Sequence, residues 1–154
     1  MLPTTVDRVP NQTCDAVNER IRHQTEESIT RLKQAGPAAI ARRLEELDGE
    51  WDVERAIEAN AATASLIGVA LGVTVNRRWL AMPAVVGAFL LQHAVQGWCP
   101  PLPVLRRLGF RTASEIDYER YALKALRGDF ADIHPDKRDR GNKFAEKALR
   151  AVEA

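Results

Sequence analysis

The chain has 154 residues, of which 45% are hydrophobic and 28% are charged, a length that suits one ordinary domain. Its 22 basic and 21 acidic residues leave a formal net charge of +1, which argues against a nucleic-acid partner. With two cysteines, Cys14 and Cys99, the sequence predicts no disulfide framework.

The charged residues are unevenly distributed along the chain. Apart from Arg77 and Arg78, residues 59–105 contain no aspartate, glutamate, lysine or arginine, which leaves two uncharged segments, 59–75 and 79–105. A charged side chain at the bilayer centre costs about 2.5 to 3.5 kcal/mol on insertion scales, so two bare segments in such a charged chain indicate a membrane protein. The alternative interpretation is the central hairpin of a soluble helical domain.

The N-terminal flank, residues 1–51, is predicted to be a cytoplasmic amphipathic helical segment. A polar helix is expected from about Asp15 to Ala35, where Gly36 stops it, and Pro37 is expected to start a second helix that ends near Gly49. The first helix has an apolar stripe that is too narrow for a self-sufficient core and suits a partner helix. The stripe consists of Val17, Ile21, Ile29 and Leu32.

Residues 52–105 are predicted to form a transmembrane hairpin, with helices at about 56–75 and 79–98. A spanning helix needs about 20 mostly apolar residues, each rising about 1.5 Å, and the second segment meets that length. Asp52 is expected to cap the first helix. The opening stretch MLPTTVDRVPNQ lacks the apolar run of a signal peptide, so the hairpin itself would direct insertion.

Tryptophan and arginine residues flank the predicted hairpin. Tryptophan is enriched at headgroup level, where its ring is buried and its N–H is hydrated. More arginines precede and follow the hairpin than lie in its loop, and the positive-inside rule places such flanks in the cytoplasm. The expected localisation is therefore the bacterial inner membrane, multi-pass, with both termini cytoplasmic. The predicted interface anchors are Trp51, Trp79, Trp98, Arg106 and Arg107.

Small and polar residues recur at four-residue spacing on both helices, where they would let the backbones approach and pair polar groups. Folding the chain about residues 76–78 sets Gly72 opposite Ala84 and Gly68 opposite Ala88. A four-residue slip keeps the same residue types in contact, and the same faces could instead join two copies in a homodimer. The helix-packing residues are Asn60, Ala64, Gly68 and Gly72 on the first helix and Ala84, Ala88, Gln92 and Gln96 on the second.

His93 lies beside Gln92 and Gln96 at the polar end of the second helix, and an ionisable group within a membrane segment is a candidate functional site. Helix packing, with the imidazole bonded to a glutamine amide, is the preferred interpretation, and a proton or cofactor role is the alternative. No metal or cofactor is predicted, because the other histidines, His23 and His134, lie in the flanks.

The second helix is followed by GWCPPLPVLRRLGFRT, residues 97–112. The Gly-x-Cys-Pro pattern that ends at Pro100, together with Gly109 and Thr112, resembles the YgaP-like inner-membrane domain, a family of unknown function. The resemblance covers roughly residues 51–114, under half of the chain. It implies a two-helix membrane unit, dimeric, that occurs alone or attached to a rhodanese sulfurtransferase domain. No rhodanese pattern is present in this sequence.

The resemblance makes Cys99 a candidate thiol for persulfide transfer with a separate sulfurtransferase. Nearby Arg106 and Arg107 would favour its thiolate, whereas the negative end of the preceding helix dipole would disfavour it. A structural role, as a small apolar residue before Pro100, is the preferred interpretation.

The C-terminal flank, residues 106–154, is predicted to be a cytoplasmic helical tail. Thr112 to Glu115 is a capping-box pattern that opens a helix closed by Gly128, and a last helix follows the charged run HPDKRDRGNK. The expected apolar residues are Ile116, Leu123 and Leu126 on the first of these helices and Phe144, Ala148, Leu149 and Val152 on the last.

The sequence thus predicts an all-α membrane protein with a two-helix transmembrane hairpin and amphipathic cytoplasmic helices on both sides. The expected function is non-catalytic: a structural or accessory module in membrane lipid that self-associates or serves as a small subunit of a larger membrane complex. The alternative is a membrane-anchored sulfur carrier acting through Cys99. No P-loop, dinucleotide fingerprint or Ser/His/Asp arrangement indicates an enzyme.

Overall fold

The computed structural model of the protein describes residues 3–131 and 142–153, with side chains described for 3–131 and 145–153. This part of the chain is all-helical, at 79% helix, and contains no strand. The predicted all-α class is therefore confirmed.

The chain divides into two compact units, each built from segments that are distant in the sequence. The first unit contains Met1–His23 and Trp51–Ile116, and the second contains Gln24–Glu50 and Asp117–Ala154. Two of the three boundaries fall inside helices, α1 (Asp15–Ala35) and α6 (Ala113–Arg127), so these two helices contribute to both units. The division differs from the three successive segments expected from the sequence, because the N-terminal residues belong with the hairpin.

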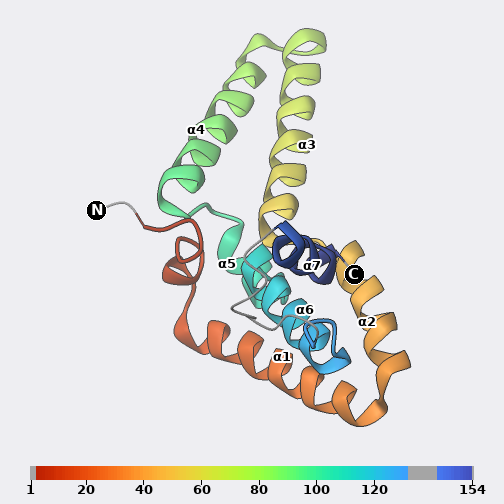
Figure 1. Ribbon diagram of the computed structural model, residues 1–154. Helices are drawn as coiled ribbons and strands as arrows, with labels where there is room; N and C mark the ends of the chain where they lie inside the picture. The colour runs from red at the N-terminus through yellow and green to blue at the C-terminus, as the bar shows by residue number, and fades with distance from the viewer. Residues whose placement is uncertain (1–2, 132–141, 154) are drawn as a thin grey trace. The chain divides into compact units, whose positions relative to one another are not determined.

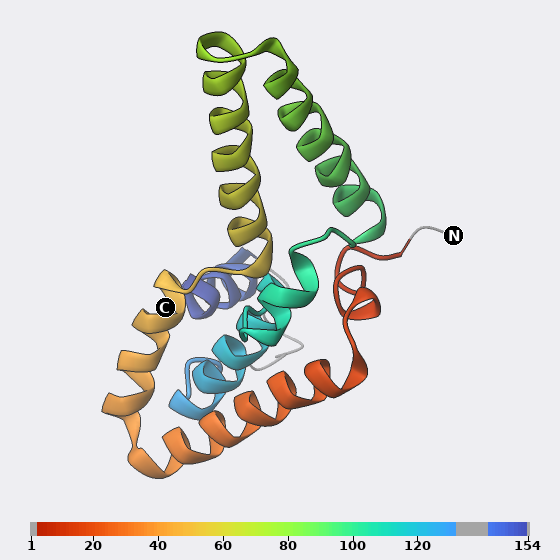
Figure 2. The same ribbon diagram turned by 180° about the vertical axis from the view of Figure 1, so that it is seen from behind.

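The first unit is organised around two antiparallel helices, α3 and α4, joined by a short turn. The helices lie close together at the turn and separate toward the other end, as both views of the ribbon show (Figure 1, Figure 2). The elements of this unit, besides the ends of α1 and α6, are η1 (Pro10–Gln12), α3 (Val53–Thr74), η2 (Arg77–Leu80), α4 (Ala81–Gln96) and α5 (Leu102–Arg107).

Local chemistry accounts for the ends of the hairpin helices. The carboxylate of Asp52 accepts a hydrogen bond from the backbone N–H of Arg55 at 2.6 Å, which confirms the predicted cap of α3. At the turn, the side chain of Asn76 accepts from the N–H of Arg78 at 2.9 Å and opens the 3-10 helix η2. The second helix therefore begins with a 3-10 turn rather than directly as an α-helix at Trp79.

The capping box that opens α6 is also confirmed. The N–H of Glu115 donates to the hydroxyl of Thr112 at 3.2 Å, and the N–H of Thr112 donates to the carboxylate of Glu115 at 2.8 Å. The helix ends at Arg127, immediately before Gly128, as the sequence predicts.

The second unit contains the remaining part of α1, together with α2 (Pro37–Gly49), the end of α6 and α7 (Asn142–Glu153). The bounds of α1 and α2 agree with the predicted ones. Its buried apolar residues are Ile40, Leu44, Leu47, Leu123 and Ala151. The Nζ of Lys124 donates to the carbonyl of Val152 at 2.6 Å, which ties α7 to α6. Most of the charged run before α7, and the side chain of Phe144, lie outside the described residues.

The second unit contains a buried carboxylate, Glu119, that connects α6 to α1 and α2 through hydrogen bonds. Its side chain is only 1% exposed and accepts hydrogen bonds from Nε and Nη2 of Arg43, both at 3.0 Å, and from the hydroxyl of Ser28 at 3.1 Å. A buried charge is tolerated when it is paired and hydrogen-bonded in this way. The apolar side expected for α6 is correct at Ile116 and Leu123 but wrong at Leu126, which is exposed.

Candidate functional site

The side chains selected from the sequence for chemistry gather at the end of the hairpin that is remote from its turn. We call this region the hairpin base and define it by the parts that meet there: residues 8–13, the first turns of α3, the last turn of α4, and α5. All of these parts belong to the first unit.

The N-terminal segment connects the two helices of the hairpin at this base. Arg8 donates from Nη2 to the carboxylate of Glu54 on α3 at 2.6 Å and from Nη1 to the carbonyl of Ala94 on α4 at 3.1 Å. The next residue, Val9, is 1% exposed and lies in the apolar core of the base. The segment therefore holds α3 and α4 together where the two helices have moved apart.

Gly97 makes this connection possible. It ends α4 with a φ of +81°, a left-handed conformation that suits glycine. A Cβ atom built at this position would lie 2.5 Å from the carbonyl carbon of Arg8. The N-terminal backbone thus passes directly against the end of α4, where no side chain fits.

Cys99 lies inside the core of the base and is 2% exposed. The buried residues around it are Val9, Val53, Ala56, Ile57, Leu102 and Leu105. Burial raises the pKa of the Cys99 thiol above its ordinary value, although a hydrogen bond from the backbone N–H of Leu102 partly opposes the shift. These surroundings suit a small apolar residue and do not favour a reactive thiolate.

We expect Cys99 to react with a maleimide far more slowly than Cys14 in the folded protein. Cys14 is exposed, whereas the thiol of Cys99 is buried and has a raised pKa, so opening of the core must precede alkylation. Mass spectrometry of the time course, with and without denaturant, measures both rates in one sample. Equal rates for the two cysteines before denaturation would contradict this.

His93 is also buried, at 6% exposed, but neither of its ring nitrogens has a hydrogen-bond partner within the described residues. The predicted bond to a glutamine amide is therefore wrong: Gln92 is half-buried, and Gln96 is exposed. Nε of Arg8 is likewise buried without a partner. The base thus combines an apolar core with polar groups that are incompletely paired, which is uncommon in folded proteins.

Arg106 is completely buried, so its predicted role as a headgroup anchor is wrong. Its guanidinium donates to both carboxylate oxygens of Glu115, at 2.6 and 2.7 Å, and also to the side chain of Asn18 at 2.8 Å and the carbonyl of Phe110 at 3.0 Å. The physical reason is its place on α5: it follows the buried Leu102 by one helical turn and therefore points into the unit. The neighbouring Arg107 is exposed, and its role as an anchor stays a prediction.

The helix-packing glycines lie between α3 and α4, but in a different register from the expected one. A Cβ on Gly72 would lie 2.5 Å from the side chain of Leu80, and a Cβ on Gly68 would lie 2.7 Å from that of Pro83. The expected pairing of Gly72 with Ala84 is therefore wrong. Large side chains of the second helix fill the space left by the glycines, so small residues do not face small residues.

The other residues of the two stripes are not buried between the helices. Ala84, Ala88, Gln96 and Asn60 are exposed, and Ala64 is half-buried. The amide of Asn60 donates to the carbonyl of Ala56 in its own helix at 2.8 Å, not to Gln96. Packing of these residues against a second copy stays a prediction.

Two of the three predicted tryptophan anchors have exposed rings, at 47% for Trp51 and 45% for Trp79, and Trp98 is half-buried. The guanidinium of Arg55 lies 4.4 Å from the ring centre of Trp51, a cation–π contact that pairs a charge with an aromatic ring at the start of α3. Such amphipathic pairs suit the boundary of a bilayer.

Within the described residues, no group of three or more histidine, cysteine, aspartate or glutamate side chains could hold a metal ion. The residues of the base that sequence reasoning missed are Arg8 and Val9. The two hydrogen bonds of Arg8 reach residues 46 and 86 positions away. A valine beside an arginine in a short polar segment gives no periodic signal, so no local pattern could have identified them.

Two helical segments, Pro37–Thr74 and Arg77–Gln96, each contain a stretch long and apolar enough to cross a membrane. The uncharged part of the first segment lies in α3. No family model matches the chain, and neither do the curated proteins and solved structures with which it was compared. The resemblance to the YgaP-like domain therefore has no support from these comparisons and stays a prediction.

Proposed function

We propose that the protein is a non-catalytic integral membrane protein whose hairpin spans the bilayer and whose helical flanks act as an accessory module in the cytoplasm. In this proposal the protein associates with itself or serves as a small subunit of a larger membrane complex. The observation that carries it is the exposure of the apolar helices: the most apolar windows of the two segments are only 22% and 6% buried.

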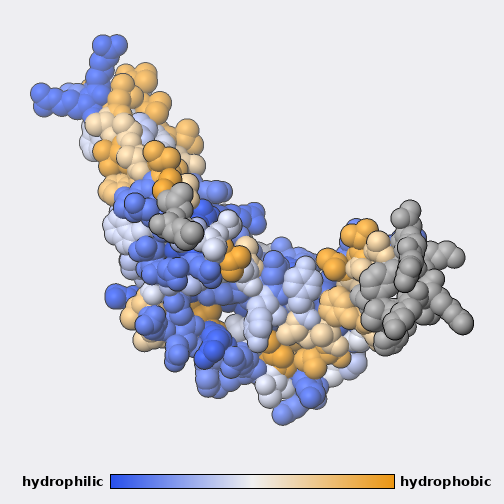
Figure 3. Space-filling view, turned by 60° about the vertical axis from the view of Figure 1, so that its left-hand side comes forward, coloured by the Kyte–Doolittle hydropathy of each residue, from blue (hydrophilic) through white to orange (hydrophobic). Residues whose placement is uncertain are grey.

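A soluble core helix buries most of its apolar surface, so low burial separates the two interpretations of an apolar segment. On the face shown in Figure 3, apolar side chains cover much of the projecting hairpin, while hydrophilic side chains gather at its tip. Soluble monomers rarely expose continuous apolar patches of more than a few hundred Å². The large exposed apolar residues of α3 and α4 are Leu66, Ile67, Val69, Val73, Val85, Phe89, Leu91 and Val95.

The dimensions of the hairpin also suit a bilayer. With 22 residues, α3 is about 33 Å long. The 16 residues of α4 and the four of η2 extend together over about 32 Å. The first turns of α3 carry Glu54, Arg55 and Glu58, so its uncharged part, residues 59–74, supplies about 24 Å of the span. This is somewhat less than a hydrocarbon core of about 30 Å, a mismatch that local thinning of the bilayer accommodates at modest cost. The turn carries Arg77 and Arg78, both exposed, which would reach the headgroups on the far side.

The exposed small residues of α4 support self-association. Ala84 and Ala88 lie one helical turn apart on α4. Their small side chains leave a surface against which a second hairpin could pack closely. Cross-linking through an Ala88→Cys replacement in membranes, with the exposed Cys14 replaced by serine, measures this directly. The absence of a cross-linked dimer would remove self-association from the proposal and leave the spanning hairpin unaffected.

Sulfur transfer through Cys99 is not favoured by any observation. The thiol is enclosed in the core of the hairpin base, and Arg106, which was expected to stabilise its thiolate, is committed to Glu115. The geometry suits a structural role for both residues.

We expect Leu66→Arg to abolish stable membrane insertion, whereas Leu108→Arg should leave it intact. Both leucines are highly exposed, at 71% and 72%, but Leu66 lies midway along α3 and Leu108 follows α5. In lipid, an arginine at mid-helix costs about 2.5 to 3.5 kcal/mol or more, whereas on a soluble surface the same change is nearly neutral. The measurement is the share of each variant that stays in the membrane pellet after an alkaline wash.

The unaltered protein provides the first control, since it must itself stay in the washed pellet. Recovery of this protein in the supernatant as a compact particle would contradict a spanning hairpin. Equal retention of the two variants would contradict the placement of Leu66 in lipid.

A further inference from the structure

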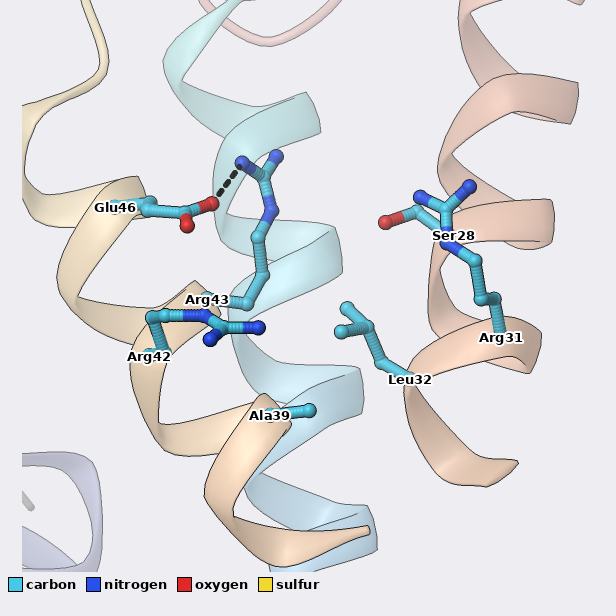
Figure 4. Close-up of a pocket in the computed structure, with 7 residues that line it drawn as sticks. All are labelled: Ser28, Arg31, Leu32, Ala39, Arg42, Arg43 and Glu46. Carbon is cyan, nitrogen blue, oxygen red and sulfur yellow. Dashed lines mark hydrogen bonds and ion pairs between the residues drawn. The ribbon is translucent and has the colours of Figure 1, made fainter. Parts of the chain in front are cut away.

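The second unit contains a cavity of about 380 Å³ between α1 and α2. Its volume lies at the lower end of the range of small-molecule sites, about 300 to 1,000 Å³. Figure 4 shows that its walls come from both helices: Ser28, Arg31 and Leu32 from α1, and Ala39, Arg42, Arg43 and Glu46 from α2.

Arg43 is a fixed part of the cavity wall. It donates four hydrogen bonds: two to the buried Glu119, one to Glu46 at 3.2 Å and one to Glu50 at 3.4 Å. A guanidinium has five N–H donors, so one donor of Arg43 remains for a ligand. The hydrogen bonds with Glu119 raise the pKa of Arg43 above its ordinary value, although burial opposes the shift. The group therefore keeps its charge.

Arg31 and Arg42 are the available cations of the cavity. They lie on opposite walls, one on each helix, and the guanidinium of Arg42 extends from α2 toward α1 (Figure 4). Within the described part of the chain, neither has a hydrogen bond or an ion pair, and both are exposed. Two like charges that face one cavity repel each other, and an anion placed between them removes this repulsion.

We infer that this cavity binds a phosphate group, held between Arg31 and Arg42 with Arg43 behind it. Three guanidinium groups line the cavity against one carboxylate, that of Glu46, which is itself bonded to Arg43. The surplus of donors on Arg31 and Arg42 favours an anionic ligand rich in oxygen. A carboxylate presents two oxygens in one plane along one edge, whereas a phosphate presents oxygens in several directions. A carboxylate can also bridge two donors, but the wider spread of the phosphate oxygens suits donors on opposite walls better.

The inference does not depend on the proposed membrane function, because it concerns the second unit by itself. A phosphate group could come from a soluble phosphomonoester or from the headgroup of an anionic lipid. Both present the same oxygens to the arginines, so the two sources require separate experiments.

The test uses the full chain in a phosphate-free maltoside detergent, titrated with inorganic phosphate at constant ionic strength and observed through the Nε–H NMR signals of the arginines. We expect a saturable shift for Arg31 and Arg42, and at least a tenfold loss of affinity in Arg31→Gln and Arg42→Gln. Arg150→Gln, which changes the net charge equally at an exposed residue of the same unit, should bind as the unaltered protein does.

A second set of measurements identifies the source of the phosphate. If phosphatidic acid in maltoside micelles displaces inorganic phosphate and phosphatidylcholine does not, the ligand is a lipid headgroup. If neither lipid displaces it, the ligand is a soluble phosphomonoester. Unchanged affinity in both Arg31→Gln and Arg42→Gln, with their thermal midpoints preserved, would overturn the site.

Discussion

Replacing Gly97 with alanine is expected to lower the free energy of unfolding of the hairpin unit by roughly 3 kcal/mol or more. The left-handed backbone costs about 1 to 2 kcal/mol for a residue with a Cβ. The new Cβ also collides with the carbonyl group of Arg8, so the N-terminal segment must move and Val9 loses its burial. Exposing a valine of this kind costs about 1.5 to 3 kcal/mol. Denaturant titration in detergent, followed by tryptophan fluorescence, measures the change.

Gly109→Ala is the matched control for this prediction. Gly109 has a φ of +96° in the same unit, but a Cβ there would meet nothing within 4 Å. The control should show only the backbone cost, about 1 to 2 kcal/mol. If Gly97→Ala destabilises the protein no more than Gly109→Ala does, the close passage of Arg8 against α4 is not important for stability.

Replacing Arg106 with methionine is expected to destabilise the same unit by about 3 to 5 kcal/mol, the usual cost of removing one partner of a buried ion pair. The change leaves Glu115, Asn18 and the carbonyl of Phe110 without their shared donor. Arg107→Met, one residue along and exposed, should change stability by less than about 0.5 kcal/mol.

A double replacement, Arg106→Met with Glu115→Leu, tests the assignment of this energy to the ion pair. It should be more stable than Arg106→Met alone, because an apolar pair does not leave a carboxylate without its partner. Additive losses would show that the two side chains act independently and would contradict the pairing as the cause.

The same ion pair predicts how stability depends on pH. Burial raises the pKa of Glu115, but the hydrogen bonds from Arg106 and from the N–H of Thr112 outweigh it, so the pKa is lowered overall. A lowered pKa in the folded state gives stability that is complete above the ordinary value, about 4.3, and is lost as the pH falls through the folded value. The unaltered protein should therefore lose stability below about pH 4, and Arg106→Met should lose less in that range.

The helix ends could be predicted from the sequence because short-range chemistry decides them. Gly36 and Pro37 separate α1 from α2, the carboxylate of Asp52 opens α3, and Thr112 and Glu115 open α6. Each of these signals depends on residues within three positions of one another. They therefore operate whatever the rest of the chain does.

The partners of the buried charges could not be predicted, because they lie far apart in the sequence. Glu119 pairs with Arg43, 76 positions away, and Arg106 reaches Asn18 over 88 positions. One clue was present: Glu119 lies on the same helical face as Ile116 and Leu123, where a carboxylate needs a cationic partner. The pattern shows that Glu119 requires a cationic partner, but it does not show which residue that partner is.

The predicted register of the hairpin is wrong for a steric reason. The expectation paired small residues with small ones, but the 3-10 turn Arg77–Leu80 brings Leu80 and then Pro83 against the glycines of α3. A glycine can pack against a bulky side chain as well as against the small side chain of an alanine. The spacing of small residues alone therefore did not determine the register.

The link from Arg8 to the end of α4 has a consequence for biosynthesis. A ribosome adds about 5 to 20 residues per second, so Arg8 is incorporated roughly 4 to 18 seconds before Gly97. During that interval, neither Ala94 nor the glycine against which the chain passes exists to receive it. The segment around Arg8 therefore has no docking surface until α4 has been synthesised, so this side of the unit cannot close before then.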